Sequence, residues 1–171
     1  MASLRTELQK ITRDALANHP RRITELRALV PHSIEVLTSP GDDLRYNCIM
    51  HALGVTKEKE LIRLVMRCPR AVHPHTRFLK FLKDRGTLIP VKRPAAGLVV
   101  VYSNGRVIRH AGRAISESMV ESKWGIGHLY QHPLMEVPSS YGSKIAFFAP
   151  VDAHSVVQEF IEFARSQGVR L

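Results

Sequence analysis

The sequence predicts an α+β fold in a single domain of 171 residues. Up to about residue 86 the apolar residues recur at helical spacing, and from residue 97 they recur at strand spacing. An Asn-Gly pair at Asn104-Gly105 lies between the first two strand-like runs, which is a strong signal for a tight hairpin. Helices followed by an antiparallel sheet are typical of the α+β class. We therefore expect N-terminal helices packed on a sheet of about four or five strands.

The expected helices begin and end at recognisable residues. Ser3 is a plausible cap for the first helix, and the chain stops being helical at Asn18-His19-Pro20. Asn47 caps a short helix that begins at or next to Cys48. The next helix ends at Cys68-Pro69. The expected helices cover residues 4–15, 21–29, 48–54, about 57–67, about 75–84, and a closing helix around 156–163.

Four strands are expected in the second half, over residues 97–102, 107–114, 119–124 and 143–149. The second strand alternates, with Arg109 and Arg113 on the same face. These arginines mark the solvent face, so His110 points inward beside small residues. The turn sequence at residues 40–43 divides the domain into a helical extension, 1–40, and a core, 41–171.

Composition excludes several classes of protein. No apolar run approaches the roughly 18 residues of a membrane span, and the first twenty residues lack a signal-peptide core. The protein is therefore expected in the cytoplasm as synthesised. Cys48 and Cys68 form no CxxC pair, and the histidines show no recognised ligand spacing. We expect no disulfide, no metal centre and no cofactor.

The net charge of +10 is concentrated in one segment. Residues 57–93 contain eleven Lys and Arg against three acids, whereas residues 94–171 contain seven against six. A cationic face attracts anionic partners. The segment is interpreted either as a site for an anionic partner or as a solvated helical surface.

Cys48 is the first candidate for chemistry. A helix N-terminus stabilises an anion by only about 0.3–1 kcal/mol, which is less than one pKa unit. A neighbouring histidine lowers a thiol pKa much further. His110, inward on its strand, is the preferred partner, and His51 on the same short helix is the alternative. A third interpretation is structural, with Cys48 a small buried residue and His110 a hydrogen-bonded core histidine.

Three segments carry a family resemblance. They are Arg-Tyr-Asn-Cys-Ile-Met-His-Ala-Leu-Gly at 45–54, Gly-Leu-Val-Val-Val-Tyr-Ser-Asn-Gly at 97–105 and His-Ala-Gly-Arg at 110–113. This order resembles the papain-like cysteine peptidases and amidases of the NlpC and CHAP type, over residues 45 to about 127. Ser-Lys-Trp-Gly at 122–125 followed by His132 is similar to a pattern in small uncharacterised bacterial domains with the same Cys and His order.

The resemblance implies a papain-like fold in which Cys48 is the nucleophile and His110 the general base. It also implies an oxyanion site formed by a backbone N–H at the helix start, such as that of Cys48, with the Tyr46 hydroxyl as a second donor. A third polar residue would orient the imidazole. Ser122 fits this role by position and His132 by residue type, and the sequence does not separate them.

The sequence supports two hypotheses about function. The leading hypothesis is a thiol hydrolase that cleaves an amide bond in a cell-wall peptide or a protein target. A small enzyme of this kind also fits a bacterial toxin or effector delivered by a dedicated secretion system. The alternative is a non-catalytic basic module that binds nucleic acid or another polyanion through residues 57–93. Neither hypothesis predicts an oligomeric state.

Overall fold

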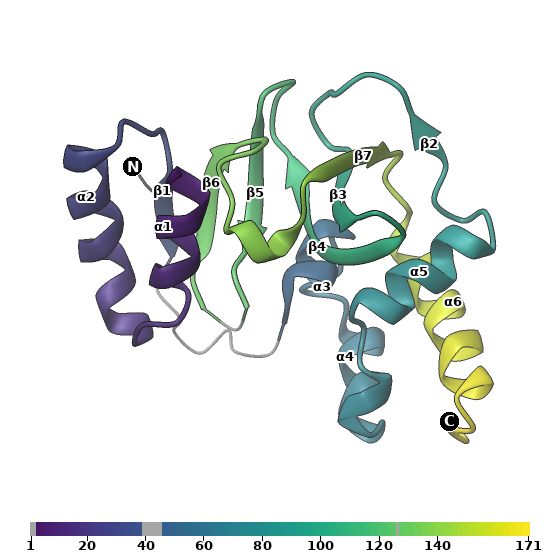
Figure 1. Ribbon diagram of the computed structural model, residues 1–171. Coiled ribbons are helices and arrows are strands. Elements are labelled where there is room, and N and C mark those ends of the chain that lie inside the picture. The colour runs from purple at the N-terminus through teal and green to yellow at the C-terminus, as the bar shows by residue number, and fades with distance from the viewer. Residues whose placement is uncertain (1–2, 39–45, 126) are drawn as a thin grey trace.

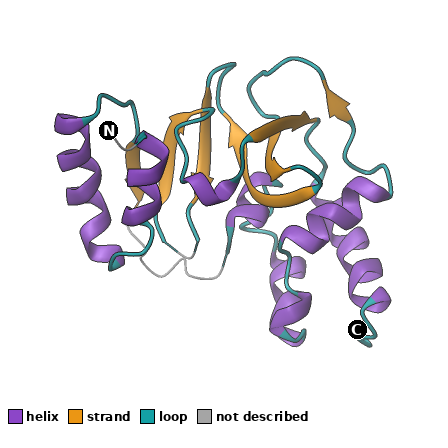
Figure 2. Cartoon of the chain, viewed as in Figure 1, coloured by secondary structure: helices purple, strands orange, loops and turns teal. Residues whose placement is uncertain are grey.

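The computed structural model describes residues 3–38, 46–125 and 127–171, and one antiparallel sheet connects two groups of helices in it (Figures 1 and 2). The sheet has seven strands in the order β1-β6-β5-β4-β3-β7-β2. The predicted α+β class is confirmed, but the predicted count of four or five strands is wrong. The predicted turn at residues 40–43 lies outside the described residues.

Along the described residues the chain forms two α-helices, one strand, three α-helices, six strands and a closing α-helix. The α-helices are α1 (Leu4–Ile11), α2 (His19–Leu29), α3 (Cys48–Ala52), α4 (Lys59–Arg67), α5 (Thr76–Asp84) and α6 (Ala153–Ser166). The strands are β1 (Glu35–Thr38), β2 (Pro90–Val91), β3 (Val99–Asn104), β4 (Val107–Ala114), β5 (Met119–Lys123), β6 (Leu129–Pro133) and β7 (Lys144–Phe148). Short 3₁₀ turns are η1 (Leu16–Asn18), η2 (Arg70–Val72) and η3 (Ser139–Tyr141).

The expected helices form, with one difference near the N-terminus. Ser3 caps α1, and His75 caps α5. However, α1 ends at Ile11 instead of continuing to about residue 15, and α2 begins at His19. Pro20 lies in the first turn of α2, where its missing N–H costs nothing, so it starts this helix instead of ending the previous one.

The three strands that were not expected lie away from the centre of the sheet. β1 pairs with β6, β6 with β5, and the two-residue β2 with β7. The central hairpin of β3 and β4 forms as predicted, and Gly105 supplies the positive φ of 59° at its turn. His110 is buried as expected, but the opposite face of β4 is also covered, because Ala111 is fully buried.

The sheet separates apolar clusters on its two sides. On one side, Val99, Val101 and Ala111 pack with residues of α3, α4, α5 and α6. On the other, Val100, Tyr102 and Val120 pack with Val137. A further cluster joins α1 and α2 to residues at the β1–β6 end of the sheet, including Trp124 and Tyr130. Figure 1 shows α1 and α2 at one end and α3 to α6 towards the other.

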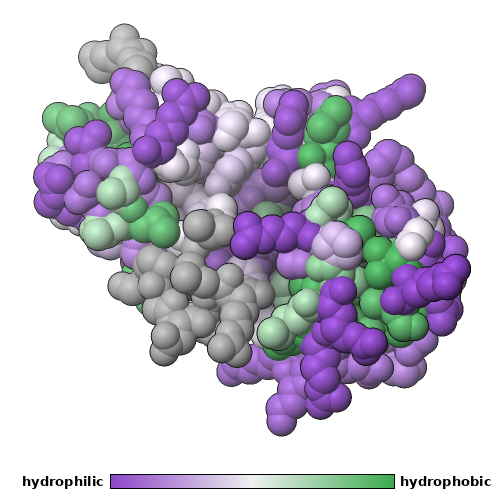
Figure 3. Space-filling view, turned by 90° about the horizontal axis from the view of Figure 1, so that it is seen from below, coloured by the Kyte–Doolittle hydropathy of each residue, from purple (hydrophilic) through white to green (hydrophobic). Residues whose placement is uncertain are grey.

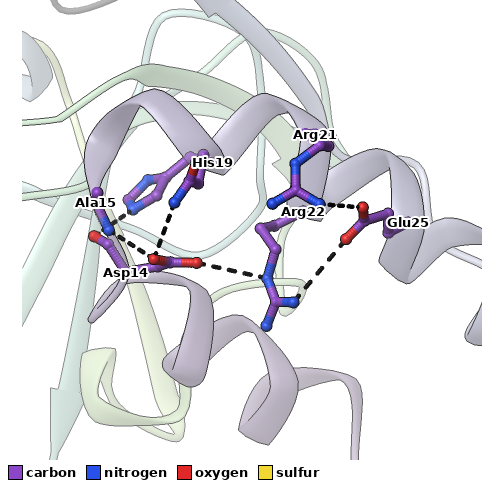
Figure 4. Close-up of polar contacts among 7 residues, drawn as sticks. Asp14, Ala15, His19, Arg21, Arg22 and Glu25 are labelled. Atoms are coloured by element: carbon purple, nitrogen blue, oxygen red, sulfur yellow. Dashed lines mark hydrogen bonds and ion pairs between the residues drawn. The ribbon is translucent and has the colours of Figure 1, made fainter.

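Polar contacts hold the segment between α1 and α2 (Figure 4). The Asp14 carboxylate accepts from the N–H of Ala15 at 2.8 Å and lies 3.6 Å from Arg22 Nε. His19 lies between this turn and the sheet, because its Nδ1 is 2.8 Å from the Tyr130 hydroxyl and its Nε2 is 3.3 Å from the Asp14 carbonyl. The segment predicted as a helical extension thus also contributes strand β1 and buried contacts to the core.

Candidate functional site

Cys48 is held at the first position of α3 by a cap on the preceding residue. The Asn47 side-chain oxygen accepts from the N–H of Ile49 at 3.0 Å and of Met50 at 3.1 Å. The Asn47 amide also donates to the Pro74 carbonyl at 2.6 Å, which ties the helix start to the segment before α5. The predicted cap and helix start are therefore confirmed, and Cys48 is partly buried beneath the sheet.

The surroundings of the Cys48 thiol act on its pKa in opposite directions. Burial raises the pKa, because it disfavours the thiolate. The backbone N–H groups of Ala111, Ile49 and Cys48 itself lower it, but by less than burial raises it. The resting group is therefore a neutral thiol that already has N–H donors around it.

His110 is buried on β4 and makes aromatic contacts instead of hydrogen bonds. Its ring stacks on Tyr141, with centroids 3.9 Å apart and planes 20° apart, and it lies 5.6 Å from the Tyr102 ring. Its Nε2 has no hydrogen-bond partner among the described residues. Burial lowers the pKa of His110 well below its usual value, and the nearby His132 and His51 lower it further. The imidazole is therefore neutral and has a free nitrogen.

Cys48 and His110 both lie at β4 and near Tyr141: the thiol is close to the N–H of Ala111, and burial together with the nearby Cys48 raises the pKa of Tyr141, whose ring stacks on His110. Within the described chain, no hydrogen bond joins the thiol to the His110 ring. The two predicted catalytic groups are thus brought to the same part of β4 but are not bonded to each other.

Ser122 and His132 are bonded to each other. Ser122 Oγ lies 2.8 Å from His132 Nε2, and His132 Nδ1 lies 2.8 Å from the Pro133 carbonyl. Because the carbonyl only accepts, Nδ1 carries the hydrogen and the Ser122 hydroxyl donates to Nε2. Trp124 Nε1 donates to Ser122 Oγ at 3.1 Å, which completes a buried chain. Burial lowers the pKa of His132 to about 4, so this histidine is neutral.

These hydrogen bonds change the expected role of Ser122 and of His132. Neither Ser122 nor His132 hydrogen-bonds to His110, although either was expected to orient it. Tyr141 holds the His110 ring by stacking instead. Tyr141 was missed by sequence reasoning, and only its aromatic character could have suggested it, because it lies 31 residues beyond His110 on a short 3₁₀ turn.

Several polar and aromatic side chains lie close together beside α3. His51 Nε2 lies 3.8 Å from Glu121 Oε2, and Lys123 Nζ lies 4.1 Å from the centre of the Tyr46 ring. The Tyr46 and His51 rings stack at 6.2 Å. Burial lowers the pKa of His51 to about 4, with Arg113 and Lys123 adding to the effect. Glu121 on β5 thus faces this helix.

The comparisons with known proteins identify a family but no activity. A family model described as "Domain of unknown function (DUF7689)" matches residues 37–149, a span that contains Cys48, His110, Ser122 and His132. No curated protein and no solved structure matches the chain. Of the helices that the structure describes, none is long and apolar enough to cross a membrane. The described residues also contain no group of three or more His, Cys, Asp or Glu side chains that could hold a metal ion.

Proposed function

Because the chain belongs to the DUF7689 family, whose description names no activity, we propose its function from its own geometry. It is a thiol hydrolase of papain-like fold, of the NlpC or CHAP type, that cleaves an amide bond in a peptide or protein. Cys48 is the nucleophile and His110 the general base. One observation carries the proposal. The Cys48 thiol at the start of α3 lies at the backbone N–H of Ala111, and the residue before Ala111 is His110, a buried histidine whose Nε2 has no hydrogen-bond partner among the described residues.

The reaction begins from two neutral groups. The Cys48 proton passes to His110, and the sulfur adds to the carbonyl carbon of the substrate. The oxyanion accepts hydrogen bonds from the backbone N–H of Cys48, with the Tyr46 hydroxyl as the second donor. His110 then returns the proton to the leaving amine as the C–N bond breaks. A water molecule attacks the thioester, His110 takes its proton, and the acid and the thiol are released.

Proton transfer requires the thiol and the ring to approach within hydrogen-bond distance, about 2.6–3.2 Å between oxygen and nitrogen atoms and longer for sulfur. They are not bonded in the free protein. The proposal therefore requires a side-chain rotation of Cys48 or His110 when substrate binds, and catalytic hydrogen bonds commonly tighten at that stage.

The test compares Cys48→Ala with Cys68→Ala, which removes the other, buried thiol. Each protein is incubated with cell-wall peptides and with a denatured protein, and new peptide termini are counted by mass spectrometry. Wild type and Cys68→Ala should produce termini, and Cys48→Ala none. His110→Ala and the double variant should be as inactive as Cys48→Ala, because members of one catalytic unit are not additive.

Two results would overturn the proposal. Termini produced by Cys48→Ala would exclude it as the nucleophile. Full activity in His110→Ala, with a lowered melting temperature, would make His110 structural and leave His51 as the base. A bacterial toxin or effector role belongs to the same proposal and depends on a protein substrate being found.

A further inference from the structure

Five exposed cationic side chains between residues 59 and 77 form no ion pair among the described residues. They are Lys59, Arg63 and Arg67 on α4, Arg70 on η2 and Arg77 in the first turn of α5, and we call this set the α4–α5 cationic face. Other cations nearby are paired, as in Lys80–Asp84 and Arg85–Glu159.

The three α4 residues form a row. Lys59, Arg63 and Arg67 are spaced four residues apart, which places them on one stripe of the helix, about 6 Å apart along its axis. The opposite side of α4 is fixed in the core by Leu61 and Val65. The helix therefore presents a row of about 12 Å to solvent and cannot turn it away.

The side chains on this face favour phosphate as the ligand. Four of the five are arginines, whose planar guanidinium binds phosphate with two parallel hydrogen bonds. Met66 is the one strongly exposed large apolar side chain of α4, at 76 % exposure, whereas a membrane-surface helix needs a broad apolar face. Figure 3 shows hydrophilic side chains projecting between small apolar patches where α4 and α6 end.

Among the described residues, the same face lacks exposed aromatic rings on which bases could stack. Phe78 is fully buried, and Phe81 is partly buried, with the Arg85 guanidinium 5.2 Å from its ring centre. Base stacking needs exposed aromatic rings. We propose that the α4–α5 cationic face binds the phosphate backbone of nucleic acid without sequence preference. None of its residues belongs to the candidate site, so the inference does not depend on the proposed function.

The experiment measures fluorescence anisotropy of a labelled 20-base-pair DNA duplex, and of an RNA duplex, between 50 and 200 mM salt. Affinity should fall about 10²-fold or more over this range. If five phosphates are neutralised, the logarithm of the binding constant should fall against the logarithm of the salt concentration with a slope of about −4.5. The variant Arg63→Gln, Arg67→Gln, Arg70→Gln should reduce the magnitude of the slope by about 2–3. Two unrelated duplex sequences should bind equally.

The matched control carries Arg13→Gln, Arg106→Gln and Arg109→Gln, which removes the same charge from exposed positions elsewhere. Its DNA affinity should stay within about twofold to threefold of wild type. Both variants are checked by circular dichroism for folding. Equal weakening in both variants would overturn the proposal, because net charge alone would then explain binding. Binding of poly-glutamate as tight as that of DNA would also overturn it and assign the face to an acidic protein.

Discussion

At the scale of single residues, the candidate site is built from groups that burial keeps neutral. The thiol of Cys48 has a raised pKa, and the imidazoles of His110, His51 and His132 have lowered ones. A thiol hydrolase with these pKa values starts from thiol and imidazole, not from an ion pair. Its activity then depends on substrate binding to bring the two groups together.

The first prediction concerns His132, whose pKa is about 4 in the folded protein and 6.5 as an ordinary value. Because its folded pKa is depressed, the unfolded chain binds a proton first, and stability is lost as pH falls from about 6.5 towards 4. This one residue should remove about 2 kcal/mol of unfolding free energy between pH 7 and pH 5. His132→Gln should reduce the pH-dependent loss by that amount, measured by urea unfolding at both pH values.

The control is His154→Gln, which removes an exposed imidazole from α6 instead of a buried one. The change in unfolding free energy between the two pH values is compared, not its absolute value. Titration of His132 changes this difference, whereas the lost hydrogen bond to Ser122 lowers stability at both pH values. An unchanged difference in His132→Gln would show that the buried chain from Trp124 to Pro133 does not keep this histidine neutral.

Residue-scale reasoning from sequence identified Cys48 and His110 correctly as residues at a helix start and on an inward strand face. It could not assign Ser122 and His132 to each other, because their bond depends on the register of β5 against β6, and β6 was not expected. It also missed Tyr141, because stacking between residues distant in the chain leaves no local pattern.

At the scale of elements, α3 is short and depends on its cap. Five residues are too few for a helix to be stable alone, so the Asn47 side chain and packing hold it. The second prediction compares Asn47→Ala with Asn47→Asp. Both lose the bond to the Pro74 carbonyl, but aspartate still accepts from Ile49 and Met50. The free energy of unfolding of Asn47→Ala, measured in urea, should therefore be about 1 kcal/mol lower than that of Asn47→Asp.

The aspartate variant should also change the thiol. A carboxylate beside Cys48 disfavours the thiolate, so the thiol pKa should rise further. Alkylation of Cys48 by iodoacetamide at pH 8, followed by peptide mapping with Cys68 as the internal reference, should be slower in Asn47→Asp than in wild type. Faster alkylation, or equal stability of the two variants, would show that the cap does not control α3.

The elements that sequence patterns predicted are those with local signals. α3, α4 and α5 have caps or a terminating Pro, and the β3–β4 hairpin has its Asn-Gly turn. The missed strands lack such signals: β2 has two residues, and β1 and β6 have four and five. Their pairing comes from tertiary contacts, since β1 is joined to β6 from about ninety residues away.

At the scale of the whole molecule, one sheet connects two groups of helices. The family match, residues 37–149, leaves out α1, α2 and α6, yet α1 and α2 cover Trp124 and Tyr130, and α6 packs with α4 and α5. The Trp124 ring stacks on Tyr130 at 4.0 Å and also donates to Ser122. The N-terminal helices therefore support the strands that carry the buried polar chain.

The last prediction is that the two helical groups unfold together. Leu8 of α1 and Leu82 of α5 are both fully buried, in separate apolar clusters at opposite ends of the sheet. Leu8→Ala and Leu82→Ala should each cost about 2–5 kcal/mol. Because the strands form one continuous hydrogen-bonded sheet, either variant should shift the whole transition. Fluorescence of Trp124, the single tryptophan, reports on the α1–α2 end, and far-ultraviolet circular dichroism reports on all helices. The two signals should change at the same urea concentration in every variant. A Leu8→Ala transition that comes earlier by fluorescence than by circular dichroism would show that the N-terminal helices detach first, and that residues 1–40 form an extension on an independently stable core.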